Sequence, residues 1–458
     1  MKNNYWTLFW RISKLSVIMW CVVCGKAFSQ ITSPDPRFKT DILLILPHPD
    51  DETAISGQLA RWVFDEGKKV SAVYTNRGQS GGNSFGKEQY HAMGAIREIE
   101  VRQALNTFGI SHVWFLNGMD TPGQDVLHSL QNLPHGEALE KVIRLVRLTR
   151  PEIIITWLPL FSAGENHGDH QAAGVIATEA FDLSGDPTVF PAQLAYPREI
   201  QDINNFYEGL QPWQPKKLYF YSDREKPLKA PGPAFDIVTV SPSKGKPYIE
   251  LAAQLHVFHK TQGFVAEMAE EAIKTGEWKP LKEWLDKFQL IFGKSVVDCD
   301  ATGDVFDGVI NSPAAFKRVS GFQKKEVQGV HLRLGGIFNF YRDFWQAHDL
   351  NHLAKFLEPE IAIAAGSYFH VPLLIQNGGN KKITLKLNAV LPKDWEEITG
   401  SGEYTLEAGQ TLPVQTFYVA PGEEKAGFQT LSWEIYQGRK KMDTVELRVS
   451  LSDWTLPQ

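Results

Sequence analysis

Two short stretches of the chain are rich in side chains that bind metals and transfer protons. The first reads PHPDDE at positions 47–52 and follows an aliphatic run, and the second reads HGDH at positions 167–170. Imidazole and carboxylate are typical ligands of catalytic zinc, and a site with three protein ligands leaves one position for water. Bound zinc lowers the pKa of that water to about 7. Together the two stretches indicate metal-assisted hydrolysis.

These stretches contain more polar groups than three metal ligands require. A further carboxylate can take a proton from water, and a further histidine can protonate a leaving amine or stabilise an oxyanion. A structural zinc site is closed by four ligands, so the surplus favours a hydrolase. Each stretch alone has a simpler explanation, because acids after a strand often cap a helix and two histidines three residues apart occur by chance.

Alternating apolar runs and amphipathic stretches predict the elements that position these residues. We expect strands at 41–47, 68–75, 112–117 and 151–159, and helices at 56–66, 97–107, 137–149 and 171–181. Strands that are aliphatic throughout and separated by helices indicate a parallel sheet covered on both faces. This predicts a doubly wound, Rossmann-like α/β domain. The carboxyl ends of its strands share one edge, so the polar stretches should meet there.

The chain has 458 residues, more than one core usually accommodates, so at least two domains are expected. After a mostly helical stretch at 242–294, the last hundred residues alternate in polarity and are rich in β-branched side chains, which predicts an antiparallel β-sandwich. Its expected roles are structural support or contact with a glycan or cell wall. The chain is therefore predicted to divide into an N-terminal segment at 1–29, the α/β domain at 30–295, a helical or mixed connecting region at 296–358 and the β-sandwich at 359–458.

The N-terminus predicts export. Basic residues precede LSVIMWCVVCG, an apolar run too short to span a bilayer, and Ala27-Phe28-Ser29 suits signal peptidase. Residues 1–29 are therefore expected to be a cleaved signal peptide, giving a periplasmic or extracellular protein without a membrane span. A retained anchor or a lipid-anchored form, the latter through Cys24, is the alternative.

Composition limits the partners and the metal ligands. Removal of residues 1–29 would leave Cys299 as the single cysteine, so any metal must use histidine and carboxylate. The net charge of −6 and the lack of a basic run argue against a nucleic-acid partner.

The sequence resembles the PIG-L/LmbE-like N-deacetylases over roughly residues 40–265. Besides PHPDDE and HGDH, the resemblance rests on TNRG at 75–78, R-E-x-E at 97–100, FLNGMD at 115–120, RPEIIIT at 150–156 and HKTQG at 259–263. The family implies a zinc site and deacetylation of an N-acetyl sugar. At the matching positions it implies three metal ligands: His48, Asp51 and His170.

The resemblance also implies the catalytic groups. Asp50 matches the general base, and His167 matches the electrophilic group or acid, with Asp169 orienting and charging it. The commoner family pattern is H-P-D-H, whereas this chain has Gly168 in place of the proline. The three polar residues keep their spacing, so the difference concerns the stiffness of the loop.

Other matches have weaker claims. Arg97 matches an arginine near a sugar hydroxyl, with a salt bridge to a neighbouring glutamate as the alternative. Asp120 matches an acid that binds sugar hydroxyls, and a cap or turn is its alternative. His259 and Gln262 line the pocket or serve helix packing. Glu52 either holds a ligand in place or favours the start of the next helix.

The expected function is a secreted zinc-dependent hydrolase that removes the N-acetyl group from an N-acetylglucosamine-type sugar or glycoconjugate. Histidine and aspartate also bind Fe²⁺, manganese or cobalt, so the metal stays open. One alternative is an amidase that cleaves a larger amide on a glycoconjugate. The other alternative is a glycan-binding surface protein without catalytic activity. The presence of Asp50 and His167 argues against it, because a protein that only binds glycans does not need these residues.

Overall fold

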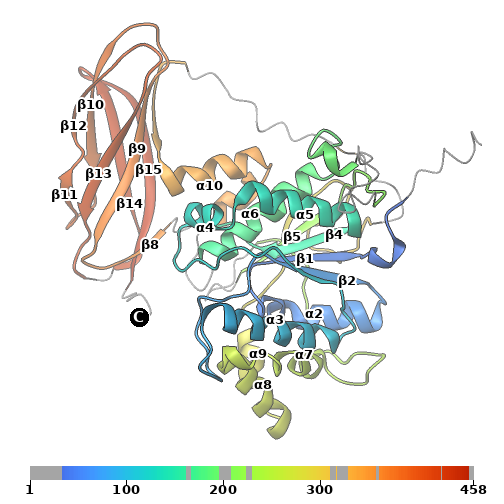
Figure 1. Ribbon diagram of the computed structural model, residues 1–458. Coiled ribbons are helices and arrows are strands. Elements are labelled where there is room, and N and C mark those ends of the chain that lie inside the picture. The colour runs from blue at the N-terminus through green and yellow to red at the C-terminus, as the bar shows by residue number, and fades with distance from the viewer. Residues whose placement is uncertain are drawn as a thin grey trace, which may run out of the picture.

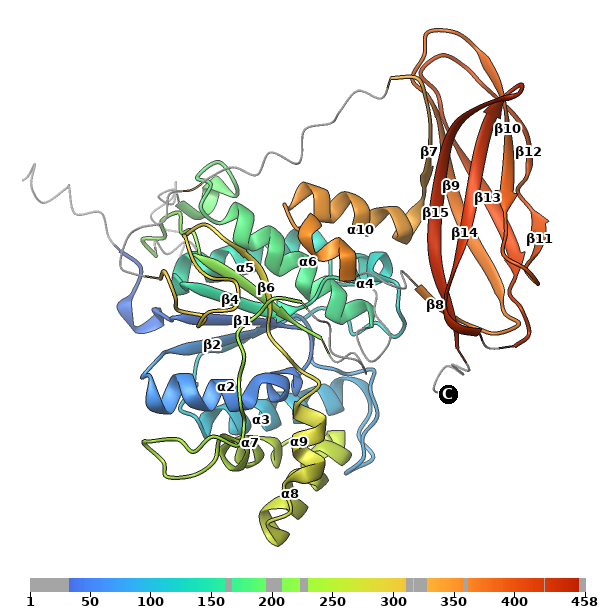
Figure 2. The same ribbon diagram turned by 180° about the vertical axis from the view of Figure 1, so that it is seen from behind.

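The computed structural model describes residues 33–160, 167–194, 208–222, 230–309, 316, 328–356, 361–423 and 425–452. The predicted signal peptide at 1–29 lies outside these ranges. Among the described helices, none combines the length and the apolar character needed to cross a membrane. An α/β body and a β-sandwich lie side by side, with helix α10 between them (Figures 1 and 2).

The α/β body is built on a six-stranded sheet in the order β3-β2-β1-β4-β5-β6. Its strands are β1 (Ile42–Leu46), β2 (Val70–Tyr74), β3 (Val113–Phe115), β4 (Ile153–Trp157), β5 (Lys217–Tyr221) and β6 (Ile291–Ser295). The first five are parallel, and β6 runs antiparallel to β5. The doubly wound α/β prediction is confirmed, whereas β5 and β6 were not predicted.

Strand β1 shows why an aliphatic run forms the centre of this sheet. Its side chains alternate between two faces, and both faces are covered. Ile42, Leu44 and Leu46 belong to one apolar core, and Leu43 and Ile45 belong to the other. All five side chains are fully buried, so no polar position is tolerated until the strand ends.

Helices cover both faces of the sheet, as Figure 1 shows. On one face lie α2 (Ser56–Ala60), α3 (Tyr90–Asn106), α7 (Tyr248–His256), α8 (Phe264–Thr275) and α9 (Lys279–Leu285). On the other lie α4 (Val126–Asn132), α5 (His135–Thr149), α6 (Gly168–Leu183) and α10 (Gly336–Ala347). The expected helix at 56–66 consists of α2 followed by the π turn η3 (Arg61–Asp65), and the 3-10 turn η2 (Asp51–Ile55) precedes it.

The strand order creates a switch point beside β1. The chain moves outward from β1 to β2 and β3, then returns to β4 on the other side of β1. Ligands in such sheets bind beyond the carboxyl ends of the strands at this reversal. PHPDDE follows β1, and HGDH begins helix α6 after β4. The connectivity therefore brings the two stretches to one edge.

The second unit is a β-sandwich of two sheets. Its strands are β7 (Val330–Leu334), β8 (Ile361–Ala364), β9 (Tyr368–Asn377), β10 (Ile383–Val390), β11 (Glu396–Thr399), β12 (Gly402–Leu406), β13 (Thr411–Val419), β14 (Lys425–Gln437) and β15 (Lys440–Ser452). The sheet orders are β12-β10-β14-β15-β8 and β11-β13-β9-β7. One detail differs from the antiparallel expectation, because β8 pairs parallel with β15.

The segment at 296–358, predicted as a connection, takes part in both units. Strand β7 pairs with β9, which extends the sandwich back to Val330. Helix α10 places Tyr341, Phe344 and Trp345 in the core over α6, while Phe338 packs against the sandwich core. The Trp345 indole N–H donates to the carbonyl of Pro159, at 3.1 Å, in the loop after β4. Helix α10 therefore packs against both the α/β body and the β-sandwich.

Candidate metal and catalytic site

Three predicted ligands converge where β1 ends and α6 begins. His48 Nδ1 lies 3.3 Å from His170 Nε2 and 3.7 Å from Asp51 Oδ2, and His170 Nε2 lies 3.2 Å from Asp51 Oδ1. Zinc binds such atoms at about 2.0–2.2 Å, which separates tetrahedral ligands from one another by roughly 3.4 Å. The three side chains thus have the spacing that a small divalent cation requires.

Two further sets of ligand atoms lie within 4.8 Å of one another: His48 with His167 and His170, and His48 with Asp120 and Asp169. All share His48, whose two nitrogens cannot face one ion together. His48 Nε2 lies 3.3 Å from Asp120 Oδ1 and 3.7 Å from Asp169 Oδ2, on the side away from Asp51. We therefore infer that these carboxylates accept a hydrogen bond from His48 Nε2–H. A histidine that binds a metal through one nitrogen usually donates its other N–H to such a carboxylate.

Aromatic packing holds His170 in place. The indole of Trp157, the last residue of β4, stacks on the His170 ring with centroids 3.9 Å apart and planes 6° apart. Trp157 is itself buried. Its ring therefore fills the core and at the same time holds the ring of His170, a predicted ligand.

The two neighbouring aspartates are costly to ionise together. Burial raises the pKa of Asp51 to about 7, and burial together with the Asp51 charge raises the pKa of half-buried Asp50 to about 8. Like-charged carboxylates in one pocket raise each other's pKa, and a bound cation reverses this effect. The donor set therefore fits a cation on chemical as well as geometric grounds.

Asp50 has an unusual backbone conformation, with φ of 118° and ψ of −22°. This left-handed region is rare for residues other than glycine, although Asp and Asn visit it more readily than most. The carbonyl of Asp50 accepts the backbone N–H and the hydroxyl of Thr53. Within the described residues its carboxylate receives no hydrogen bond, so it remains available to accept a proton.

His167 caps helix α6 and faces the two ligand histidines. Its Nδ1 accepts the backbone N–H of Asp169 at 3.3 Å, which leaves the proton on Nε2. Its ring centroid lies 4.2 Å from that of His170 and 4.9 Å from that of His48. Burial, and then the charges of His170 and His48, lower the pKa of His167 to about 2. The ring is therefore a neutral hydrogen-bond donor at neutral pH.

The Asp169 side chain makes other contacts than those expected. Its Oδ2 accepts from the Asn76 amide at 3.0 Å and from the Thr121 backbone N–H at 2.9 Å. The hydrogen bond to His167 comes from the Asp169 backbone. The Asp169 carboxylate thus ties together the loops after β2 and β3. Asn76 lies in the TNRG motif, so the sequence offered a signal for it, but Thr121 carries none.

Asp120 contacts His48, one of the predicted metal ligands. Oδ1 faces His48, and Oδ2 accepts the backbone N–H of Ser80 at 2.7 Å. Burial opposes its ionisation, yet the hydrogen bond to His48 holds the pKa of Asp120 far below its usual range. Both carboxylate oxygens thus have partners within the protein, and the sugar contact that the resemblance implies for Asp120 stays a prediction.

Arg97 is buried, and the alternative of a salt bridge with a neighbouring glutamate is not found among the described residues. Glu98 pairs with Arg77 and Arg102, and Glu100 binds Thr261 through its backbone N–H and hydroxyl. The Arg97 guanidinium donates to the carbonyl of Gly82 at 3.0 Å. Its positive charge lowers the pKa of Asp50 and so partly offsets the effect of burial on that carboxyl.

The glycines of the loop after β2 make room for Arg97. A Cβ atom on Gly78 or on Gly81 would collide with the guanidinium. Gly78 also has a positive φ of 63°, which an L side chain rarely adopts. The glycine-rich loop therefore admits a buried cation to the edge of the site.

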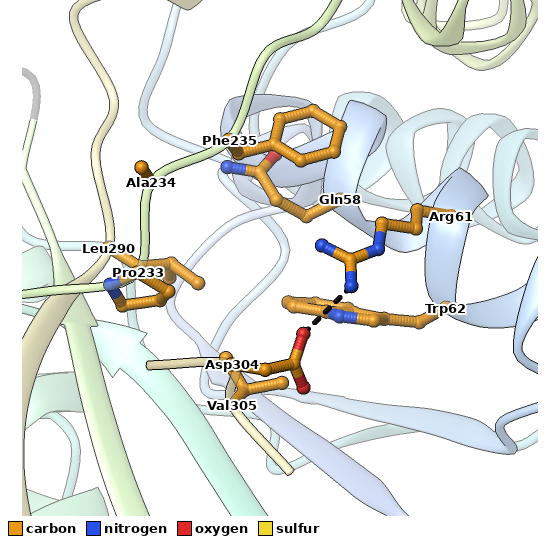
Figure 3. A pocket seen from close by; sticks show the side chains of 9 residues that line it. All are labelled: Gln58, Arg61, Trp62, Pro233, Ala234, Phe235, Leu290, Asp304 and Val305. Carbon is orange, nitrogen blue, oxygen red and sulfur yellow. Dashed lines mark hydrogen bonds and ion pairs between the residues drawn. The ribbon is translucent and has the colours of Figure 1, made fainter. Parts of the chain in front are cut away.

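A pocket elsewhere in the α/β body contains none of these groups. Figure 3 shows its lining residues, which are Gln58, Arg61, Trp62, Pro233, Ala234, Phe235, Leu290, Asp304 and Val305. The Arg61 guanidinium forms an ion pair with Asp304 at 2.8 Å across it. The pocket lacks a nucleophile or a ligand cluster, so we assign it no part in the chemistry.

Comparisons with known proteins agree with this site. Residues 43–181 match the family model described as GlcNAc-PI de-N-acetylase, PIG-L. The 1D-myo-inositol 2-acetamido-2-deoxy-alpha-D-glucopyranoside deacetylase 1 of Catenulispora acidiphila is 27% identical over 192 residues, covering 39% of this chain and 58% of the relative. The corresponding deacetylase of Geodermatophilus obscurus is 30% identical over 166 residues, covering 33% of this chain and 55% of the relative.

Among solved structures, the N,N'-diacetylchitobiose deacetylase from Pyrococcus horikoshii is 19% identical, with a TM-score of 0.38. The similarity covers 55% of this chain and 84% of that chain. This chain thus spans little more than half the length of the two curated relatives. The match to the PIG-L family model covers residues 43–181, and this stretch contains all three predicted metal ligands.

Proposed function

We propose that this protein is a metal-dependent N-deacetylase that hydrolyses the acetamide of an N-acetylglucosamine-type sugar or glycoconjugate. The observation that carries the proposal is the convergence of His48 Nδ1, His170 Nε2 and Asp51 within 3.2–3.7 Å, next to Asp50. The family match and the deacetylase relatives support the substrate class.

His48, Asp51 and His170 would hold the metal. Zn²⁺ fits this set of ligands, and Fe²⁺ is the alternative. When bound, such an ion polarises the acetyl carbonyl and lowers the pKa of a coordinated water to about 7. The outer contacts of Asp120 and Trp157 keep His48 and His170 oriented for this task.

Asp50 acts as the general base. Its carboxylate takes a proton from the water as the oxygen attacks the acetyl carbon, and the carbonyl oxygen becomes an oxyanion. The same proton then passes to the sugar nitrogen as the carbon–nitrogen bond breaks, which releases acetate and a free amine. One carboxylate beside the metal site can carry the proton in both transfers.

His167 stabilises the oxyanion as a neutral donor. Its Nδ1 is occupied by the Asp169 backbone N–H, so Nε2–H is the group that can reach the substrate. A donor already in place when negative charge develops lowers the barrier. Arg97 supplies a positive charge that acts on Asp50, and we assign it to contact with a sugar hydroxyl.

An amidase that cleaves a larger amide remains the second enzymatic candidate, because the same residues would serve it. A glycan-binding protein without catalysis is less well supported, since it would not need the unengaged carboxylate of Asp50. Export through the signal-like segment at 1–29 also belongs to the proposal. It would bring the enzyme to periplasmic or extracellular glycans.

The test is an acetate-release screen with the full chain. Free N-acetylglucosamine, chitobiose and larger N-acetylated glycoconjugates are incubated with the protein before and after chelation, and metal content is measured in the same samples. Acetate release that depends on metal is expected with at least one of them. Release of a larger acid instead would favour the amidase, and the absence of metal-dependent turnover on all of them would refute the proposed enzyme.

A further inference from the structure

A buried ion pair lies directly behind Asp50. The Glu52 carboxylate, in η2, and the His259 ring, which follows α7, are fully buried. His259 Nε2 lies 2.6 Å from Glu52 Oε1, although the two residues are 207 positions apart in the sequence. Neither the metal-binding set nor the catalytic steps described above use this pair.

The second oxygen of Glu52 reaches the backbone of the general base. Glu52 Oε2 accepts the backbone N–H of Asp50 at 3.1 Å and the hydroxyl of Tyr74 at 2.8 Å. The carboxylate is thus held from three directions by His259, Tyr74 and the peptide of Asp50. A displacement of His259 would be passed to Asp50 through one rigid side chain.

The backbone of Asp50 needs such support. Its φ of 118° is unfavourable for any residue with a side chain, and such conformations persist only where the surroundings determine them. The same conformation separates the directions of Asp50 and Asp51, so that Asp51 contacts His48 and His170 while Asp50 remains unengaged.

We propose that His259 is a positioning residue, which acts through Glu52 to hold the Asp50 backbone in its left-handed conformation and so to aim the general base. This inference rests on the proposed deacetylase function and adds a residue to it. A purely structural ion pair would stabilise the fold without a selective effect on turnover. The two roles are therefore separable by experiment.

The chain offers a matched control in His256. This histidine is also fully buried, three positions earlier, but its Nε2 contacts the Ser56 hydroxyl at 2.9 Å and the Thr53 carbonyl at 3.3 Å. None of these groups is Glu52. Replacing His256 creates a comparable buried defect on the same helical layer and removes no hydrogen bond of Glu52 or Asp50, although His256 does contact the carbonyl of Thr53.

The experiment compares His259→Leu, His259→Gln and His256→Leu in the full chain. We measure kcat and KM for acetate release, metal content and thermal stability. His259→Leu should lower kcat about 10–100-fold, the usual loss for an outer partner, with KM and metal content near wild type. His259→Gln should recover part of kcat, because its amide can still donate to Glu52. His256→Leu should keep kcat.

Several results would overturn the proposal. They are an unchanged kcat in His259→Leu, an equal loss of kcat in His256→Leu, and a loss of activity explained entirely by lost metal. If His259→Leu does not fold, Glu52→Gln replaces it. Its amide NH2 group only donates, so one of the two accepting oxygens is lost, and the same fall in kcat is required.

A crystal structure of the metal-free variant separates this inference from the proposed function. In His259→Leu, or in Glu52→Gln if that variant replaces it, Asp50 should leave the left-handed region. An unchanged φ near 118° would contradict the positioning role whether or not a substrate has been found. Failure of the wild type to release acetate would instead count against the deacetylase function alone.

Discussion

The indole of Trp157 lies flat against the imidazole of His170, with ring centroids 3.9 Å apart and planes 6° apart. This stack makes the end of β4 a support for a ligand on α6. We expect Trp157→Leu to weaken metal binding about 10-fold or more, because the His170 ring would gain rotational freedom. Competition with a chromogenic chelator measures the affinity. Trp114→Leu, in β3, is the control and should leave the affinity unchanged.

His170→Ala should abolish stoichiometric metal binding, because two protein ligands remain of the three. Metal analysis after dialysis provides the measurement. His135→Ala serves as the control, since His135 pairs with Glu179 and has no contact with the ligand set. Full metal occupancy in His170→Ala would show that another residue completes the site.

Asp50→Asn should separate catalysis from metal binding. Asparagine tolerates the left-handed backbone that this position requires but cannot act as a base. We expect acetate release to fall by about 10²–10⁴-fold while metal content stays at the wild-type level. Measurements of kcat/KM and of metal content on the same preparation test both parts. Wild-type turnover in the variant would remove Asp50 from the proposed role.

Asp120→Asn should lower metal affinity without removing a ligand. Asp120 faces His48 Nε2 at 3.3 Å and so fixes which nitrogen of His48 faces the metal. The expected loss is about 10–100-fold, measured by competition with a chelator. Asp125→Asn is a nearby control, because Asp125 caps α4 through the Leu127 N–H. Equal affinities in the two variants would argue against an outer-shell role for Asp120.

The lowered pKa of Asp65 predicts that the stability of the fold depends on pH. Burial opposes its ionisation, but hydrogen bonds from Ser243, Tyr248 and Ser241 outweigh it and lower the pKa of Asp65 to about 2. A carboxyl whose pKa is lower in the folded than in the unfolded state stabilises the fold above about pH 3.9, and this stabilisation disappears as the pH falls towards 2.

Urea unfolding of wild type and Asp65→Asn at several pH values tests this. The wild type should be more stable at pH 7, and the difference should shrink between about pH 4 and pH 2. A difference that stays constant over this range would mean that ionisation of Asp65 contributes nothing to stability.

The sequence by itself determined the α/β body and the polar stretches at its edge. Strands β1, β2, β3 and β4 could be predicted because a strand of a parallel sheet covered on both faces is apolar at most of its positions. The convergence of His48 and His170 was expected because the carboxyl ends of parallel strands share an edge. The alternating polarity and the β-branched side chains of the last hundred residues likewise predicted the β-sandwich.

Only the tertiary structure decided how these groups divide their work. His259 reaches Glu52 across 207 positions, Asp169 turns to Asn76 and Thr121, and Asp120 reaches back to His48. Contacts between such distant positions leave no period or spacing in the sequence. Strands β5 and β6 were missed for the same reason, since their positions depend on surfaces that distant segments provide. The periodicity of the sequence indicates which face of a helix or strand is buried. Only the tertiary structure shows which residues that face packs against.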